Sequence, residues 1–227
     1  KKFSPIILII PCRKYFDFVK NLWAQKLDGK TLLERDLEMC CKSDVIDHIV
    51  VISDTNEVLK IVSNFKKKDK RISFIKRNMQ DTNRKTSILF SLKNIIKKMD
   101  PRLSGVVILR YIQTPFVTHF TLEEAISTIV LANATSSIGI ESIKNEIFFR
   151  KKENLTSLNY KQTNQINKQE FYKDTTTCLA FKSKNIENNS LTGNRVVGFE
   201  VTSAESFFIS SPNDLKVANT LLKEVKK

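Results

Sequence analysis

Two cations and an amide follow the first apolar segment of this chain at positions suited to binding phosphate. The segment Ile6–Ile10 leads into Arg13, and Lys20 and Asn21 follow after six intervening residues. A guanidinium grips phosphate oxygens through two parallel hydrogen bonds, and an ammonium acts as a point charge. Phosphoryl and nucleotidyl transfers depend on such charge, because the developing negative charge lies on phosphate oxygens. Arg13 and Lys20 are therefore candidate catalytic residues, and with Asn21 they are candidate ligands of an anionic nucleotide; the alternative is that both cations are ordinary surface residues of a loop.

A second polar group lies farther along the chain, where another short apolar segment ends. Arg77 follows that segment, and Arg84 and Ser87 precede an amphipathic stretch. Because Arg84 and Ser87 are three residues apart, they fall on one side of a helix start and can bracket a base or a ribose. The alternative is a polar first turn that Ser87 caps. Arg77, Arg84 and Ser87 complete the set of candidate nucleotide-binding residues.

The elements that must position these residues alternate between strand and helix patterns. Continuous apolar runs predict strands buried on both faces, and apolar residues every three to four positions predict amphipathic helices. In the first part of the chain the expected strands are Ile6–Ile10, Ile49–Ile52, Ile72–Ile75 and Val106–Leu109, and the expected helices are Thr31–Cys41, Asn56–Phe65, Ser87–Met99 and Thr121–Leu131. In the rest we expect strands at Ser136–Ile143, Glu146–Arg150, Thr175–Phe181 and Val196–Val201 and a closing helix at Asp214–Val225.

This alternation predicts an α/β fold. We expect a single domain, residues 1–227, with a β/α half at 1–135 that binds the nucleotide and a mixed half at 136–227. The polar, asparagine- and glutamine-rich segment Lys151–Lys173 predicts an exposed hairpin or a flexible excursion. Open α/β sheets bind their ligands at the carboxyl ends of the strands, which is where Arg13 falls.

Composition excludes several other classes of protein. The chain has 227 residues, of which 41% are hydrophobic and 27% charged, as in globular proteins. Its apolar runs are too short for a membrane span, and no signal peptide is recognisable, so we expect a cytoplasmic protein. Four cysteines without a C-x-x-C spacing and two histidines favour neither a zinc site nor a disulfide framework. The net charge of +14 comes mainly from scattered lysines, so we favour solvated side chains over a nucleic-acid surface.

The order and spacing of the motifs resemble the cytidylyltransferase family, which has the nucleotide-diphospho-sugar transferase fold. The resemblance is strongest to the enzymes that activate sialic acid and related nonulosonic acids as CMP-sugars, and it extends to the methylerythritol-phosphate and ribitol-phosphate cytidylyltransferases. It covers nearly the whole chain and rests on Pro11-Cys12-Arg13, Lys20-Asn21-Leu22, Gly29-Lys30-Thr31-Leu32, Ser53-Asp54, Lys76-Arg77, Asp81-Thr82, Arg84, Ser87 and Ser211-Pro212-Asn213-Asp214-Leu215.

The resemblance implies a three-layer α/β/α fold around a mixed, mostly parallel sheet. It also implies the transfer of CMP from CTP to a sugar acid of the nonulosonate type, or to a sugar phosphate, with release of pyrophosphate. Lys20-Asn21-Leu22 and the segment Tyr172–Phe181 favour the sugar acid. Relatives often dimerise through the second half, so a homodimer is expected.

Three departures from the family pattern bear on the active site. The loop between Arg13 and Lys20 is two residues shorter than the family's and has no glycine, although glycine is what lets backbone amides approach phosphates closely. Phe208-Ile209-Ser210 stands where the family places the aspartates that bind Mg²⁺, and Arg110–Pro115 lacks an aspartate that some relatives have. We therefore assign no metal ligand. Two hypotheses stay open: a divergent active enzyme, and a degenerate homologue that binds a nucleotide or a partner.

Overall fold

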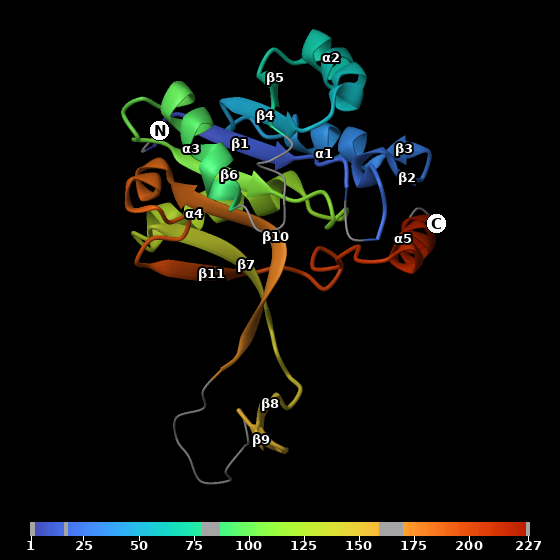
Figure 1. Ribbon diagram of the computed structural model, residues 1–227, viewed down its shortest axis with the longest axis vertical. Helices are drawn as coiled ribbons and strands as arrows, with labels where there is room; N and C mark the ends of the chain where they lie inside the picture. The colour runs from blue at the N-terminus through green and yellow to red at the C-terminus, as the bar shows by residue number, and fades with distance from the viewer. Residues whose placement is uncertain (1–2, 16–17, 79–86, 159–169, 226–227) are drawn as a thin grey trace.

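A seven-stranded sheet forms the centre of the molecule (Figure 1). The computed structural model describes residues 3–15, 18–78, 87–158 and 170–225. In spatial order the sheet runs β11-β7-β10-β6-β1-β4-β5. Its strands are β1 (Ile6–Pro11), β4 (His48–Ser53), β5 (Ile72–Lys76), β6 (Val106–Arg110), β7 (Ser136–Ser142), β10 (Tyr172–Lys182) and β11 (Val196–Glu200).

The sheet is mixed but mostly parallel. β6, β1, β4 and β5 pair in parallel, and so do β11 and β7, whereas β10 is antiparallel to both of its neighbours, β6 and β7. Strand β1 is an interior strand between β6 and β4, and Ile6–Ile10 is at most 4% exposed, as its uninterrupted apolar sequence predicts. Because β10 runs the other way, its first residues lie beside the carboxyl ends of β6 and β7.

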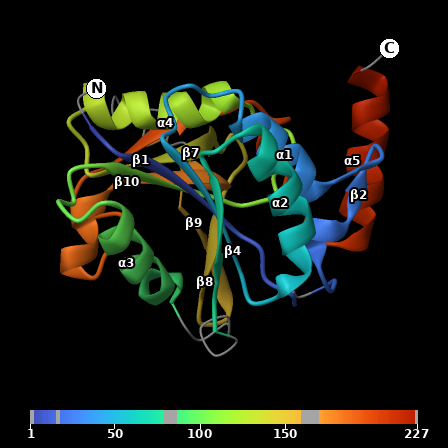
Figure 2. The same cartoon turned by 90° about the horizontal axis from the view of Figure 1, so that it is seen from above.

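Helices cover both faces of the sheet, so the three-layer prediction is confirmed. Leu8 and Ile10 belong to the hydrophobic cluster of α1 (Leu32–Cys40), α2 (Leu59–Lys68) and α4 (His119–Leu131). Ile7 and Ile9 belong to the cluster of α3 (Ile88–Met99) and the 3₁₀ helix η4 (Ser183–Asn188) on the other face. Figure 2 shows the sheet between α4 and α3. The last helix, α5 (Pro212–Val225), joins the first cluster through Ala218 and lies beside the short strand β2 (Lys26–Leu27), which pairs with β3 (Lys30–Thr31).

Local sequence explains where the helices begin. Thr31 accepts a hydrogen bond from the Glu34 amide, and the Glu34 side chain accepts one from the Thr31 amide, which is a capping box at the start of α1. Ser211 and Asp214 make the same kind of contact at the start of α5, with Pro212 as the first helical residue. Among the described residues, no helix is long and apolar enough to cross a membrane.

A narrow arm extends from one end of the sheet (Figure 1). The ends of β7 and β10 lead into an antiparallel hairpin of β8 (Phe148–Lys151) and β9 (Asn154–Ser157), which turns at Lys152 with a φ of 56°. The hairpin predicted as one alternative for the polar segment Lys151–Lys173 is confirmed at its start, where β9 lies, although the first strand of the hairpin begins upstream at Phe148. Residues 159–169 of that segment lie outside the described part of the chain.

Candidate active site

The connections of the central strands locate the candidate site. From β1 the chain passes to β4 and β5 on one side, and it then returns to β6 on the other side of β1. Such a reversal between neighbouring parallel strands opens a crevice outside their carboxyl ends, where α/β proteins bind ligands. Arg13 comes two residues after β1 and Tyr111 directly after β6. The predicted catalytic residue Arg13 therefore lies at the switch point of the sheet.

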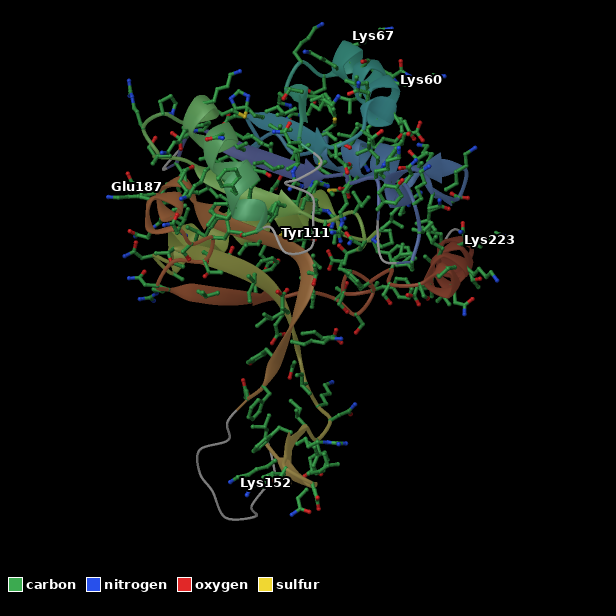
Figure 3. All side chains as sticks on the ribbon, in the orientation of Figure 1. Lys60, Lys67, Tyr111, Lys152, Glu187 and Lys223 are labelled. Atoms are coloured by element: carbon green, nitrogen blue, oxygen red, sulfur yellow. The ribbon has the colours of Figure 1, made fainter. Side chains whose placement is uncertain are left out.

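Tyr111, which motif comparison had not singled out, lies within electrostatic reach of both Arg13 and Asp174. Burial raises the pKa of the Tyr111 phenol, the Asp174 carboxylate raises it further, and the Arg13 guanidinium lowers it. Tyr111, directly after β6, is thus influenced by a residue that follows β1 and by one near the start of β10. Figure 3 shows Tyr111 at the carboxyl end of β6. A cation, a phenol and a carboxylate at one strand edge can bind phosphate and sugar hydroxyl groups together.

The loop after β1 folds back on itself. The Asn21 amide donates to the Lys14 carbonyl over 2.6 Å, and Tyr15 and Lys20 form an isolated antiparallel bridge. The Lys14 amide donates to Asp54 Oδ1 over 2.8 Å, which fixes the base of the loop to the end of β4. The Lys20 side chain is exposed. These contacts bring Arg13 and Lys20 to the same glycine-free turn of chain; residues 16–17 lie outside the described ranges.

Asn21 holds this loop in place. Its backbone is left-handed, with a φ of 53°, and its side-chain amide donates to Glu57 Oε2 over 2.7 Å. Glu57 belongs to the 3₁₀ turn η2 (Asn56–Val58) after β4, and the Lys14 ammonium lies 3.8 Å from its other carboxylate oxygen. The buried Oδ1 of Asn21 has no hydrogen-bond partner within the described part of the protein. The amide nitrogen of Asn21 therefore anchors the loop, and the oxygen is the atom left for a ligand.

The second group of predicted residues is only partly brought to this edge. Arg77, 8% exposed, lies just beyond β5, and its Nε donates to Ser91 Oγ on α3 over 3.1 Å. Ser87 accepts a hydrogen bond from the Leu89 amide as the cap of α3, as the alternative interpretation of this residue expected. Arg84 and the Asp81-Thr82 motif lie outside the described residues. The nucleotide-binding roles of Arg77, Arg84 and Ser87 stay predictions.

A buried ion pair lies beneath the site and was missed in the sequence. The guanidinium of Arg110, the last residue of β6, is 2.8 Å from Asp36 on α1, and both side chains are at most 5% exposed. A signal for it exists, because Asp36 shares the apolar face of its helix with Leu33, Leu37 and Cys40 at helical spacing. An acid on that face requires a buried partner.

The described residues do not form a magnesium site. Phe208 is 39% exposed, Ile209 belongs to the core, and Ser210 donates from its amide and its hydroxyl to Asp214. This segment does lie at the carboxyl edge, because the Ile209 amide donates to the Gln113 carbonyl in the loop after β6. Within the described ranges, no group of three or more His, Cys, Asp and Glu residues is placed to hold a metal. Mg²⁺ prefers carboxylate oxygens, so this donor set does not fit a metal held by the protein.

The fold and the switch-point site define the class of protein as nucleotidyltransferase-like. The chain belongs to the cytidylyltransferase family, whose model matches residues 7–225. No curated protein matches it in sequence. Among solved structures it is similar to 4-diphosphocytidyl-2C-methyl-D-erythritol synthase from Anaerococcus prevotii DSM 20548, with 17% identity, 96% of each chain covered and a TM-score of 0.70. It is also similar to a CMP:2-keto-3-deoxy-manno-octonic acid synthetase complexed with CTP, with 12% identity, 98% of this chain and 100% of that chain covered and a TM-score of 0.72.

Proposed function

We propose that this protein is a divergent cytidylyltransferase that transfers CMP from CTP to a sugar acid of the nonulosonate type. An acceptor oxygen attacks the α-phosphorus of CTP, a new oxygen–phosphorus bond forms, and the bond to the bridging oxygen breaks so that pyrophosphate leaves. The observation that carries the proposal is the position of Arg13 at the switch point of a chain that the family model matches over residues 7–225.

Positive charge and positioning are what such a reaction needs from the protein. Arg13 binds phosphate oxygens in a fork, and Lys20, exposed on the returning side of the same loop, supplies a second charge. Tyr111 and Asp174 are placed to contact acceptor hydroxyls, because they come from neighbouring strands at this edge. The family commonly uses Mg²⁺, but no step here is assigned to it because the described donor set does not fit it.

The proposal includes a homodimer formed through the arm. Four apolar side chains on the arm are between 41% and 65% exposed: Phe148, Leu155, Leu158 and Tyr172. Such a cluster on a thin projection favours burial against another chain. A second copy of this chain is the partner that the family resemblance suggests.

A second candidate function is a degenerate homologue that binds a nucleotide or a partner without catalysis. The closed loop after β1 favours it, since a loop without glycine that bonds to itself offers fewer free backbone amides to a triphosphate. Ser210 favours it too, because this residue stands where the family has a carboxylate, and its amide and hydroxyl both donate to Asp214.

Calorimetric titration of CTP, with and without Mg²⁺, tests both candidates. Wild-type protein is compared with Arg13→Ala, Lys20→Ala and the control Lys97→Ala, which removes an exposed lysine in the last turn of α3. We expect at least tenfold weaker binding in the two site variants, which is a loss of about 1.4 kcal/mol each, and no change in the control. Pyrophosphate release is then screened with sugar acids and sugar phosphates.

The outcomes separate the hypotheses. Binding with pyrophosphate release supports the enzyme, and release with a sugar phosphate alone rejects the sugar acid. Binding without release for any acceptor favours the degenerate homologue. If no nucleoside triphosphate binds at millimolar concentration, both nucleotide-based functions are wrong.

A further inference from the structure

Arg110 joins the three elements that meet beneath the candidate site. Its Nη1 donates to the Thr177 carbonyl of β10 over 2.9 Å and to the Tyr111 carbonyl. Its Nη2 donates to the Thr114 carbonyl over 2.6 Å and pairs with Asp36 on α1. The whole side chain is buried. One guanidinium thus fixes the loop after β6, strand β10 and helix α1 to one another.

The part of β10 that Arg110 holds is a bulge. Asp174 pairs opposite Ile140, but Leu179 pairs opposite Ile138, so extra residues of β10 are accommodated between them. Gly139 makes room for them, because a Cβ there would come within 2.1 Å of Thr177 Oγ1. Bulges re-aim side chains and are common beside active sites. The bulge in β10 begins after Asp174, and Asp174 lies within electrostatic reach of Tyr111.

We call the loop 111–114 and the bulge 174–178 together the floor. We propose that Arg110, held by Asp36, is a positioning residue that sets the geometry of the floor and so the affinity of the site for nucleotide. The last clause rests on the proposed function, whereas the control of the floor does not.

Energetics support a positioning role over a purely stabilising one. Burial raises the pKa of Asp36, and the Arg110 guanidinium, 2.8 Å away, opposes that rise. Buried ion pairs are nevertheless weak stabilisers, and apolar replacements of similar volume are often neutral or better. What an apolar pair cannot do is bond two carbonyls of the loop and one of the bulge at once. Lysine cannot do so either, because it lacks the planar fork of arginine.

The chain provides a matched control at the opposite end of the sheet. Arg71, just before β5, donates to the carbonyls of Cys41, Ser43 and Ile46 and pairs with Asp69 at 2.7 Å. Like Arg110, Arg71 therefore binds three backbone carbonyls and one aspartate. It lies at the amino ends of β4 and β5, away from the floor.

The test compares Arg110→Lys with Arg71→Lys in the full chain. Each variant is measured by thermal unfolding, by hydrogen exchange and by CTP titration. We expect both variants to lose stability. Only Arg110→Lys is expected to speed the exchange of backbone amide hydrogens in the floor and to weaken CTP binding at least tenfold. Arg71→Lys is expected to speed exchange around 41–46 and to bind CTP as the wild type does.

Two results overturn the proposal. One is Arg110→Lys with wild-type exchange in the floor, and the other is an equal loss of CTP affinity in both variants, which shows a general effect of stability. If Arg110→Lys does not fold, Asp36→Asn takes its place, since it keeps an acceptor and removes the buried charge. If the wild type binds no CTP, the proposed function fails, and hydrogen exchange alone decides whether Arg110 holds the floor.

Discussion

Asn21 donates its side-chain amide to Glu57 over 2.7 Å, and this bond ties the loop after β1 to the turn after β4. The two residues follow the neighbouring parallel strands β1 and β4, whose carboxyl ends form the candidate site. The bond therefore sets how far the Arg13–Lys20 loop stands from the next strand. A residue predicted as a nucleotide ligand acts, in this structure, on the shape of the loop that carries the two cations.

Asn21→Asp is predicted to open this loop, because it places a second carboxylate against Glu57. We expect a loss of about 1 kcal/mol in the free energy of unfolding and weaker CTP binding. Aspartate tolerates the left-handed backbone of this position, so the effect is on the bond. The double variant Asn21→Asp with Glu57→Gln restores a donor and an acceptor, and it should recover both quantities in urea unfolding and CTP titration. No recovery would contradict the anchoring role.

Gly139→Ala is predicted to disrupt the bulge in β10. The added methyl group would lie 2.1 Å from Thr177 Oγ1 and 3.0 Å from Thr175 Oγ1, so the strands must move apart. We expect a loss of about 1–3 kcal/mol, as for other overpacked sites. Adding Thr177→Ala removes the nearest atom and should restore part of the stability in urea unfolding. If Gly139→Ala alone is as stable as the wild type, the close packing of the bulge is wrong.

Asp214 is predicted to make the start of α5 sensitive to acid. Hydrogen bonds from Ser210, then from Ser211, hold the pKa of its carboxyl below the usual 3.8. The folded state thus favours the charged form, and the stability that this gives is present above pH 3.8 and lost as pH falls through the lower folded value. Asp214→Asn should cost about 0.5–1 kcal/mol at pH 7, as for a charge at a helix N-terminus.

The difference between wild type and Asp214→Asn should therefore shrink in unfolding curves recorded from pH 7 down to pH 3. Glu187→Gln, at an exposed carboxylate on η4 (Figure 3), is the control for loss of one negative charge. A constant difference across this range would mean that the charge of Asp214 does not matter.

The four cysteines are predicted to react slowly with iodoacetamide while the protein is folded. Burial, and then the Asp69 carboxylate, raise the pKa of Cys41 to about 11. Burial raises the pKa of Cys178 to about 12 and those of Cys12 and Cys40 well above their usual value. Since the thiolate is the reactive form, labelling of half-buried Cys41 should rise about tenfold per pH unit between pH 8 and 10. Mass spectrometry should find the other three labelled only after unfolding in urea.

Leu155→Glu is predicted to weaken the proposed dimer. Leu155, in β9 of the arm, is 65% exposed, and a carboxylate there would have to be buried on association. Sedimentation velocity should show a dimer for the wild type and a shift toward monomer for the variant. Lys152→Glu at the turn of the hairpin changes charge without removing apolar surface and is the control. A wild-type protein that is monomeric at tens of micromolar would contradict the dimer.

The apolar pattern predicted the elements of the core well. β1 and β4 extend at most one residue beyond each end of the predicted strands, because short continuous apolar runs of that length are typical of buried strands. The helix expected at Asn56–Phe65 is divided instead into η2 and α2, and α2 continues to Lys68. Lysine is a good helix former, so the basic run extends the helix until Asp69 ends it. Lys60 and Lys67 on α2 project into solvent, as expected for most of the positive charge (Figure 3).

Of the candidate site, the sequence predicted the charged residues of the loop after β1 but not the contacts that hold them in place. The position of Arg13 follows from the sequence, because a cation after a central parallel strand falls at the ligand-binding edge. The contacts of Asn21 with Glu57 and of Arg110 with Asp36 join residues 36 and 74 positions apart. Their pairing depends on strand order, which periodicity does not specify. The bulge was hidden for the same reason, since only the register against β7 reveals the extra residues.

Strand β10 divides at Asp174 into two stretches that evolution can treat differently. On the side of the arm, chain can be inserted or deleted between Ser142 and Tyr172 at little entropic cost, because loop closure depends only weakly on length. On the other side, the bulge between Asp174 and Leu179 packs against Gly139 and is bonded by Arg110, so one residue gained or lost there would disturb the floor. Homologues should therefore differ in the length of the arm while the spacing from Asp174 to Leu179 stays constant.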